Sequence, residues 1–172
     1  MTIIRRTMSF ILILVGGAVF SQAPEFTQQY RQRLGGALDE LQAIVSAFEA
    51  QAAQFGLDRQ AALKTYAASQ SPFLVGQGET MRSTLSRYDT LLLQQAELAR
   101  EPVVTRPLVL LRHVDLQIAR NAWRDFIPAV PIDLAGLVWS LAGCLSGWAM
   151  SSGLYLFSKR PVRRSIRRSP KH

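Results

Sequence analysis

Apolar residues form two continuous runs near the ends of the chain, and between these runs they recur with the spacing of helices. The C-terminal run contains no charged residue from Leu134 to Phe157. At about 1.5 Å per residue it makes roughly 36 Å of helix, which crosses a hydrocarbon core of about 30 Å with some tilt. A buried helix of a soluble protein rarely needs this length. The pattern therefore predicts a C-terminal transmembrane helix over residues 132–157.

The N-terminal run, Thr7 to Phe20, follows a short basic head and has two interpretations. A cleaved signal peptide has such a head and apolar run, and the residues from Ser21 to Ala23 offer a cleavage site. A retained transmembrane helix of this length lies near the short end of those that span a bilayer. Because Pro24 would directly follow the cleavage site and hinder cleavage, we favour an N-terminal transmembrane helix over residues 1–23, with the signal peptide as the alternative.

A long amphipathic helix is predicted to open the region between the runs. From Phe26 to Phe55, apolar residues recur every three or four positions with polar residues between them, as in a coiled-coil stripe. The stripe consists of Phe26, Tyr30, Leu34, Ala37, Leu41, Ile44, Phe48, Ala52 and Phe55. Gly35 and Gly36 interrupt it, and they predict either a bend or a place where another helix packs tightly.

A second long helix is predicted from Phe73 to Arg100, after a short helix over residues 59–68 that Asp58 would cap. Its apolar stripe consists of Leu74, Met81, Leu85, Tyr88, Leu92 and Gln95 or Ala96. The two long stripes match in length and can face each other in an antiparallel arrangement.

The last helical segment before the second span is predicted from Leu108 to Ile127. Its apolar face consists of Leu111, Val114, Ile118 and Ala122. No long stretch of the chain alternates with a period of two, so we expect no β-strand. We therefore predict an all-α membrane protein, in which two transmembrane helices flank an extracytoplasmic antiparallel helical hairpin or small bundle over residues 24–131.

The formal net charge of +8 lies at the two ends of the chain. Residues 24–131 carry equal numbers of basic and acidic side chains, whereas Arg5 and Arg6 precede the first run and a basic tail over residues 158–172 follows the second. Short basic segments stay on the cytoplasmic side of a membrane. We therefore expect a two-pass protein of the bacterial inner (cell) membrane, with both termini cytoplasmic and residues 24–131 periplasmic.

The basic tail is expected to bind anionic lipid headgroups, since each Lys or Arg near an anionic leaflet contributes about 1 kcal/mol. Its basic residues are Lys159, Arg160, Arg163, Arg164, Arg167, Arg168 and Lys171. Segments that bind nucleic acid usually carry aromatic residues among the basic ones, and the tail lacks them. The expected partners are therefore the lipid bilayer and its anionic headgroups, and no nucleic acid.

Small residues predict a contact between the two transmembrane helices. These helix-packing residues are Gly16, Gly17 and Ser21 in the first run and Ser140, Gly143, Gly147 and Ser151 in the second. Small side chains let two helix backbones approach closely in a membrane, and Gly143 with Gly147 forms a GxxxG pair. We expect the two strips to pack against each other, and the alternative is packing against a second copy of the C-terminal helix.

Aromatic residues lie just before the second span. Trp123 and Phe126 precede the segment from Pro128 to Pro131, which leads into the apolar run. Aromatic side chains are enriched at the boundary between membrane and water. We therefore expect Trp123 and Phe126 to act as an interfacial anchor.

Candidate catalytic and metal-binding residues are few. His113 has only Asp115 close by in the sequence, whereas a zinc site normally needs three or four protein ligands. Cys144, the single cysteine, lies in an apolar run where a thiol is an inert core residue. Asp133 lies at the start of the second span, where its negative charge interacts favourably with the positive end of the helix dipole. We expect no enzymatic activity, no catalytic residue, no metal and no cofactor.

Three segments carry a resemblance to a known family. They are SQAPEFTQQYRQRLGGALDEL at residues 21–41, SPFL at residues 71–74 and WRDFIPAVP at residues 123–131. In these segments the chain resembles the uncharacterised proteobacterial membrane proteins of domain-of-unknown-function family 2937. The resemblance extends over nearly the whole chain up to the tail. It implies an inner-membrane protein with two spans and a helical region between them, and it assigns no activity and no site.

Two functions of different classes fit these features. In the first, the chain is a non-enzymatic scaffold or interaction protein, whose periplasmic helical bundle packs on itself, on a second copy in a homo-oligomer or on an envelope protein complex. In the second, it is a small accessory subunit of a membrane transporter, channel or enzyme complex, with the spans as the functional part. The matched apolar stripes favour the first function.

Overall fold

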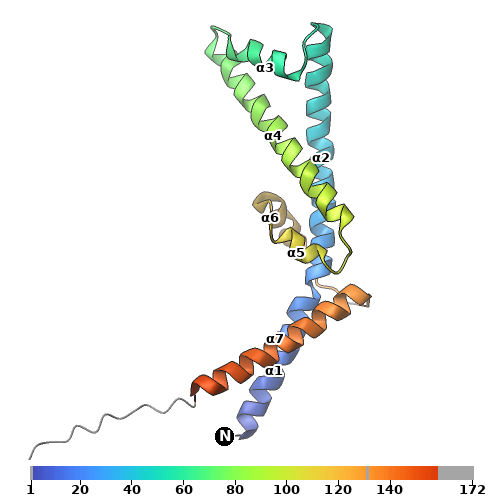
Figure 1. Cartoon of the computed structure of the whole chain (residues 1–172), viewed down its shortest axis with the longest axis vertical. Coiled ribbons are helices and arrows are strands. Elements are labelled where there is room, and N and C mark those ends of the chain that lie inside the picture. Colours follow the sequence, from blue (N-terminus) through green and yellow to red (C-terminus); the bar gives the residue numbers. More distant parts are fainter. Residues whose placement is uncertain (1, 131, 159–172) are drawn as a thin grey trace, which may run out of the picture. The chain divides into compact units, whose positions relative to one another are not determined.

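All regular structure in the described part of the chain is α-helical. The computed structural model describes residues 2–130 and 132–158, and Figure 1 shows its seven helices in these ranges. The helices pack as two units: α1 and α7 form the first, and Ala23–Val130 forms the second. This confirms the predicted all-α class.

The first unit is a pair of helices, α1 (Thr2–Ser21) and α7 (Leu134–Ser158), which correspond to the two apolar runs. Asp133 caps α7, because its Oδ1 accepts a hydrogen bond of 3.1 Å from the backbone N–H of Gly136. This position suits a carboxylate, since the N-terminus of a helix carries a partial positive charge.

The second unit is built on two long helices, α2 (Ala23–Gln54) and α4 (Pro72–Arg100). Gly56 ends α2 with a φ of +69°, a conformation that favours glycine. The side chain of Asp58 then caps α3 (Arg59–Ala67) by accepting a hydrogen bond of 2.7 Å from the N–H of Ala61. Pro72 occupies the first turn of α4, where its missing N–H costs no helical hydrogen bond.

Two hydrophobic clusters hold the second unit together. The first joins α2 and α4 to the short helices α5 (Arg106–Leu110) and α6 (Leu116–Arg124). Its buried residues are Tyr30, Leu34, Leu38, Leu91, Leu98, Leu110, Ile118 and Ala122. The second cluster joins α2 and α4 to α3, and its buried residues are Val45, Phe48, Ala52, Ala62, Leu63 and Leu85.

The buried faces of the long helices differ in part from the predicted stripes. On α2, Ile44 is 48% exposed, whereas Leu38 and Val45 are buried; Phe55, just after the end of α2, is 74% exposed. On α4, Leu92 is 43% exposed and the preceding Leu91 is buried. The predicted membership of Ile44, Phe55 and Leu92 in the core is therefore wrong.

The cause of this difference on α4 is a change of neighbour along the helix. Near its start, Gly78 lies against the side chain of Tyr66 on α3. Near its end, Gln94 donates a hydrogen bond to the backbone carbonyl of His113, between α5 and α6. Because these neighbours lie on different sides of α4, the buried face turns around the helix, and a single stripe of constant period does not describe it.

The predicted continuous segment from Leu108 to Ile127 is wrong, because the chain leaves the helical conformation between α5 and α6. Asp115 has an extended backbone there, and its Oδ1 accepts hydrogen bonds of 2.9 Å from the N–H groups of Gln117 and Ile118. Leu111, expected on the apolar face, is 76% exposed. The N-cap of α6 overrides the apolar spacing that suggested one helix.

Gly35 and Gly36 lie inside α2, which continues through both. A Cβ atom at Gly36 would meet nothing within 4 Å, and one at Gly35 would meet only the Nε2 of Gln95 at 3.9 Å. The predicted tight approach of another helix at these glycines is therefore wrong.

Replacement of Gly36 by alanine should stabilise the protein. Alanine favours a helix over glycine by up to about 1 kcal/mol, and here the added methyl group meets open space. The midpoint of thermal unfolding in mild detergent should rise. Gly56→Ala provides the matched control and should lower it, because the φ of Gly56 is positive. Equal effects of the two substitutions would contradict this account.

Candidate functional site

The helix pair of the first unit is held together by direct contact between backbones. A Cβ atom at Gly143 would lie 2.6 Å from the carbonyl carbon of Gly16, and one at Gly147 would lie 2.7 Å from that of Leu12. Real Cβ contacts are essentially never this short. Only glycine therefore fits at these two positions of α7.

The contact continues along both helices in opposite chain directions. A Cβ atom at Gly17 would lie 2.7 Å from the Sγ of Cys144 and 3.5 Å from the Oγ of Ser140. The rings of Phe20 and Trp139 follow, with centroids 6.3 Å apart. Since residue numbers rise along α1 as they fall along α7, the pair is antiparallel.

The structure brings most of the predicted helix-packing residues together. Gly16 and Gly17 of α1 lie against Gly143 and Ser140 of α7. Gly147 lies beside Gly16 too, since a Cβ atom at Gly16 would lie 3.5 Å from the backbone nitrogen of Gly147, but its tightest approach is to the backbone of Leu12, one turn before the predicted strip.

The outer serines of the two strips bond within their own helices. Ser21 is buried, and its Oγ donates a hydrogen bond of 2.8 Å to the carbonyl of Ala18. Ser151 is half-buried, and its Oγ donates to the carbonyl of Trp148 at 3.1 Å. Each hydroxyl group thus has a hydrogen-bond partner within its own helix, which suits an apolar environment.

Large apolar side chains cover the remaining surface of α1 and α7. Those that are at least half exposed are Ile3, Met8, Phe10, Leu14, Val15 and Val19 on α1, and Leu134, Leu137, Leu141, Leu145, Trp148 and Met150 on α7. Both helices are long and apolar enough to cross a membrane, and in the most apolar 18-residue stretch of each candidate span only 17% and 22% of the residues are buried. The core helix of a soluble protein is usually mostly buried, whereas α1 and α7 expose most of their apolar surface.

An aromatic cluster contains both residues of the predicted interfacial anchor. Phe26 of α2 lies edge-on to Trp123 and Phe126, with ring centroids 5.9 and 5.8 Å away. Trp123 and Phe126 stack on each other at 5.7 Å. Trp123 is nevertheless 68% exposed, and Ile127 beside it is 75% exposed. The cluster thus fixes an apolar surface at the end of α6, and its role as an interfacial anchor stays a prediction.

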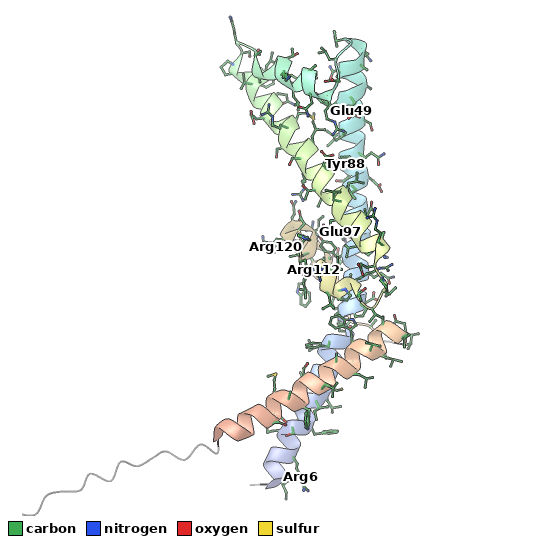
Figure 2. All side chains as sticks on the ribbon, in the orientation of Figure 1. Arg6, Glu49, Tyr88, Glu97, Arg112 and Arg120 are labelled. Carbon is green, nitrogen blue, oxygen red and sulfur yellow. The ribbon has the colours of Figure 1, made fainter. Side chains whose placement is uncertain are left out.

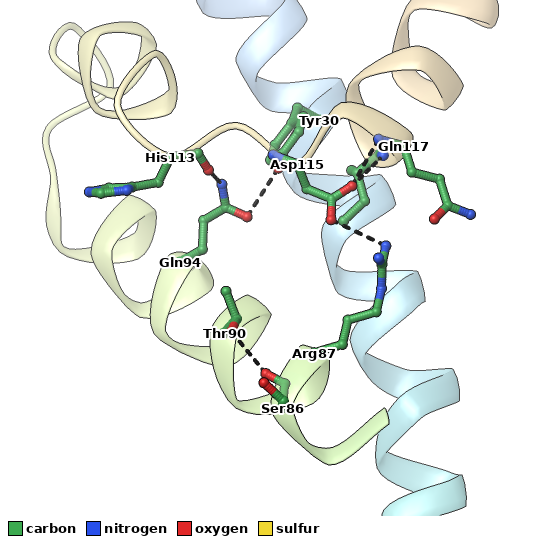
Figure 3. Close-up of polar contacts among 9 residues, drawn as sticks. Tyr30, Ser86, Arg87, Thr90, Gln94, His113, Asp115 and Gln117 are labelled. Atoms are coloured by element: carbon green, nitrogen blue, oxygen red, sulfur yellow. Dashed lines mark hydrogen bonds and ion pairs between the residues drawn. The ribbon is translucent and has the colours of Figure 1, made fainter. Parts of the chain in front are cut away.

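A polar network, which the sequence patterns did not indicate, ties the segment between α5 and α6 to the long helices. Figure 3 shows Tyr30 of α2 at its centre: its hydroxyl donates to the Oε1 of Gln94 and accepts from the N–H of Asp115, both at 3.0 Å. The carboxylate of Asp115 also forms an ion pair of 3.2 Å with Arg87 of α4. Asp115 is therefore occupied by structural contacts.

The imidazole of His113 takes no part in this network, and Figure 3 shows it pointing away from Asp115. Only the backbone carbonyl of His113 is used, as the acceptor for Gln94. In residues 2–130 and 132–158, no group of three or more His, Cys, Asp or Glu side chains could hold a metal ion.

Burial raises the pKa of the Tyr30 hydroxyl. The folded state therefore holds this proton more tightly than the unfolded chain, whose tyrosine titrates near pH 10. The resulting stabilisation is complete below about pH 10 and is lost as the pH rises through the folded-state pKa.

The family model described as a protein of unknown function, DUF2937, matches residues 4–164. The chain belongs to the DUF2937 family. This confirms the predicted family membership. Neither the curated proteins nor the solved structures contain a match to this DUF2937 protein.

The predicted lipid-binding residues of the DUF2937 protein, Lys159 to Lys171 in the tail, lie outside the described residues. The Lys159–Lys171 prediction therefore stays a prediction from charge alone. The described residues contain separate features in the two units: the glycine contact between α1 and α7 with the apolar surface around it in the first unit, and the aromatic cluster and the Tyr30 network in the second.

The glycine contact can be tested with Gly143→Ile. The larger side chain would meet the backbone of Gly16, which cannot yield as a flexible side chain would, so we expect a loss of about 1–3 kcal/mol or more in stability. Thermal unfolding in mild detergent measures it. Gly153→Ile in the same helix is the control, because a Cβ atom there meets nothing within 4 Å. An unchanged melting temperature for Gly143→Ile would argue against the contact.

The Tyr30 network can be tested with Tyr30→Phe. The substitution leaves Gln94 and Asp115 each without one hydrogen-bond partner, which costs about 1–3 kcal/mol. Denaturant unfolding should show this loss. Tyr88→Phe is the matched control, because this half-buried tyrosine of α4 packs on the same core and its hydroxyl bonds no described residue. Equal stability of the two variants would refute the role of the Tyr30 hydroxyl.

Proposed function

We propose that this DUF2937 protein is a non-enzymatic scaffold of the bacterial inner membrane that presents a helical hairpin outside the cytoplasm. The observation that carries the proposal is the glycine-packed pair of α1 and α7, whose other faces are covered by exposed apolar side chains. In a membrane such a surface faces lipid, and the backbones within the pair approach closely enough for van der Waals attraction to hold them.

The antiparallel direction of the pair supports a two-pass topology. The end of α1 lies beside the start of α7, as the contact of Phe20 with Trp139 indicates. Residues 23–130 therefore leave and re-enter the pair at one end, on one side of the membrane. The basic residues at both chain termini favour a cytoplasmic location for those termini.

The second unit supports a scaffold more than an enzyme. Its long helices α2 and α4 pack in opposite directions, since Tyr30 near the start of α2 bonds Gln94 near the end of α4. Partly exposed charged side chains also join its helices: Arg59 of α3 contacts both Glu49 of α2, at 2.5 Å, and Asp89 of α4, at 3.6 Å. Such a hairpin offers an extended surface for another protein.

The topology can be tested by reporter insertion at Gln70, in the turn between α3 and α4. Alkaline phosphatase, which is active only outside the cytoplasm, should be active there. Green fluorescent protein fused after His172 should fluoresce, because we expect that end in the cytoplasm. The reverse pattern, with inactive phosphatase at Gln70, would refute the topology.

The class of function is then tested by purification of the tagged chain in mild detergent with its bound proteins. A scaffold should co-purify with envelope proteins that bind the helical hairpin of residues 23–130. A stoichiometric transporter or channel that remains bound through α1 and α7 would instead identify the chain as an accessory subunit.

A further inference from the structure

One exposed face of α4 carries a charge pattern that repeats along the helix. Glu79 and Arg82 lie in its first half, and Glu97 and Arg100 lie at its end. Glu97 and Arg100 follow Glu79 and Arg82 after about five whole turns, since one turn takes about 3.6 residues. The two pairs therefore lie on the same face of the helix. All four are exposed, and none forms an ion pair with another described residue. Figure 2 shows Glu97 on this helix.

Shape also leaves this face open for another helix. A hollow of about 540 Å³ borders its first half, with α3 as the wall. A second hollow of about 480 Å³ borders its other half, with the segment from His113 to Asp115 as the wall. Leu93 lines both hollows and is 68% exposed.

We propose that this face of α4 binds the same face of a second copy of the chain in an antiparallel arrangement. A two-fold axis between Asp89 and Thr90 would place Arg82 opposite Glu97 of the second copy, and Glu79 opposite Arg100 of the second copy. Each contact occurs twice by symmetry, as in every two-fold interface. In this register every one of the four charges therefore faces an opposite charge on the second copy.

In the same register, the exposed side chain of Leu93 meets a hollow on the second copy. Leu93 of the second copy lies opposite Ser86, which lines the first hollow together with Leu63 and Leu85. At the centre, the charge of Asp89 is offset by Arg59 of its own chain at 3.6 Å. A parallel pair in register would instead place Arg82 beside Arg82 and Glu97 beside Glu97, and this repulsion excludes it.

The inference deepens the proposed scaffold function by naming its partner, yet it stands on α4 alone. Its test therefore uses the full chain in mild detergent, where self-association is measured by energy transfer between two labelled populations. An unexpected topology at Gln70 would not change the measured self-association, and a lack of self-association would not change the topology.

Charge reversal tests the pairing directly. Arg82→Glu and Glu97→Arg should each weaken self-association by about tenfold or more, because two ion pairs become repulsive. A mixture of the two variants should associate like the wild type, since opposite charges then face each other in both contacts. Because the mixture restores binding, misfolding cannot explain the loss. Self-association of Arg82→Glu at wild-type strength, or a mixture that stays dissociated, would overturn the proposal.

Disulfide trapping tests the direction, in a Cys144→Ala background. Ser86→Cys and Leu93→Cys chains should cross-link when mixed and not when alone, because residues 86 and 93 face each other only in the antiparallel register. In a parallel pair they would be about 10 Å apart along the axis, too far for a disulfide. Cross-links within either single population, or none in the mixture, would overturn it.

The apolar contact has its own matched control. Leu93→Ala should weaken self-association, whereas Leu92→Ala should leave it unchanged, because Leu92 is 43% exposed on a different face of α4. Equal effects of the two substitutions would count against the proposed face.

Discussion

The backbone contact between α1 and α7 is the constraint on which the arrangement of this chain depends. It joins segments from opposite ends of the sequence, and it places the end of α1 beside the start of α7. The intervening residues 23–130 are thereby closed into a loop whose ends are held together. The entropy cost of closing a loop grows only slowly with its length. A large folded unit can therefore be inserted between α1 and α7 at little extra cost.

Glycine determines how close this contact becomes. In a membrane, apolar side chains gain little by leaving lipid for another helix, so close packing of backbones supplies the attraction. Gly143 and Gly147 remove the side chains that would keep α7 away from Gly16 and Leu12. By contrast, Gly36 in α2 has open space around it, so the same residue type marks a contact in one helix and none in the other.

The second unit separates its inner contacts from its outer surface. Tyr30, Gln94 and Asp115 use their polar groups on one another and tie the segment between α5 and α6 to the long helices. A buried network of this kind rigidifies a fold when every member is satisfied. Glu79, Arg82, Glu97 and Arg100 on the exposed face of α4, by contrast, form no ion pair with another described residue.

The amino-acid sequence by itself determined the helical class, the two apolar helices and the family, because each depends on local period, length or a recurring motif. It also indicated Asp58 as a cap and Asp133 as a carboxylate at the positive end of a helix, and both of these act within one turn. Only the tertiary structure decided that Leu91 is buried and Leu92 exposed, since that depends on which neighbour lies beside each part of α4. The Tyr30 network likewise joins residues far apart in the chain, and no local pattern records such a contact.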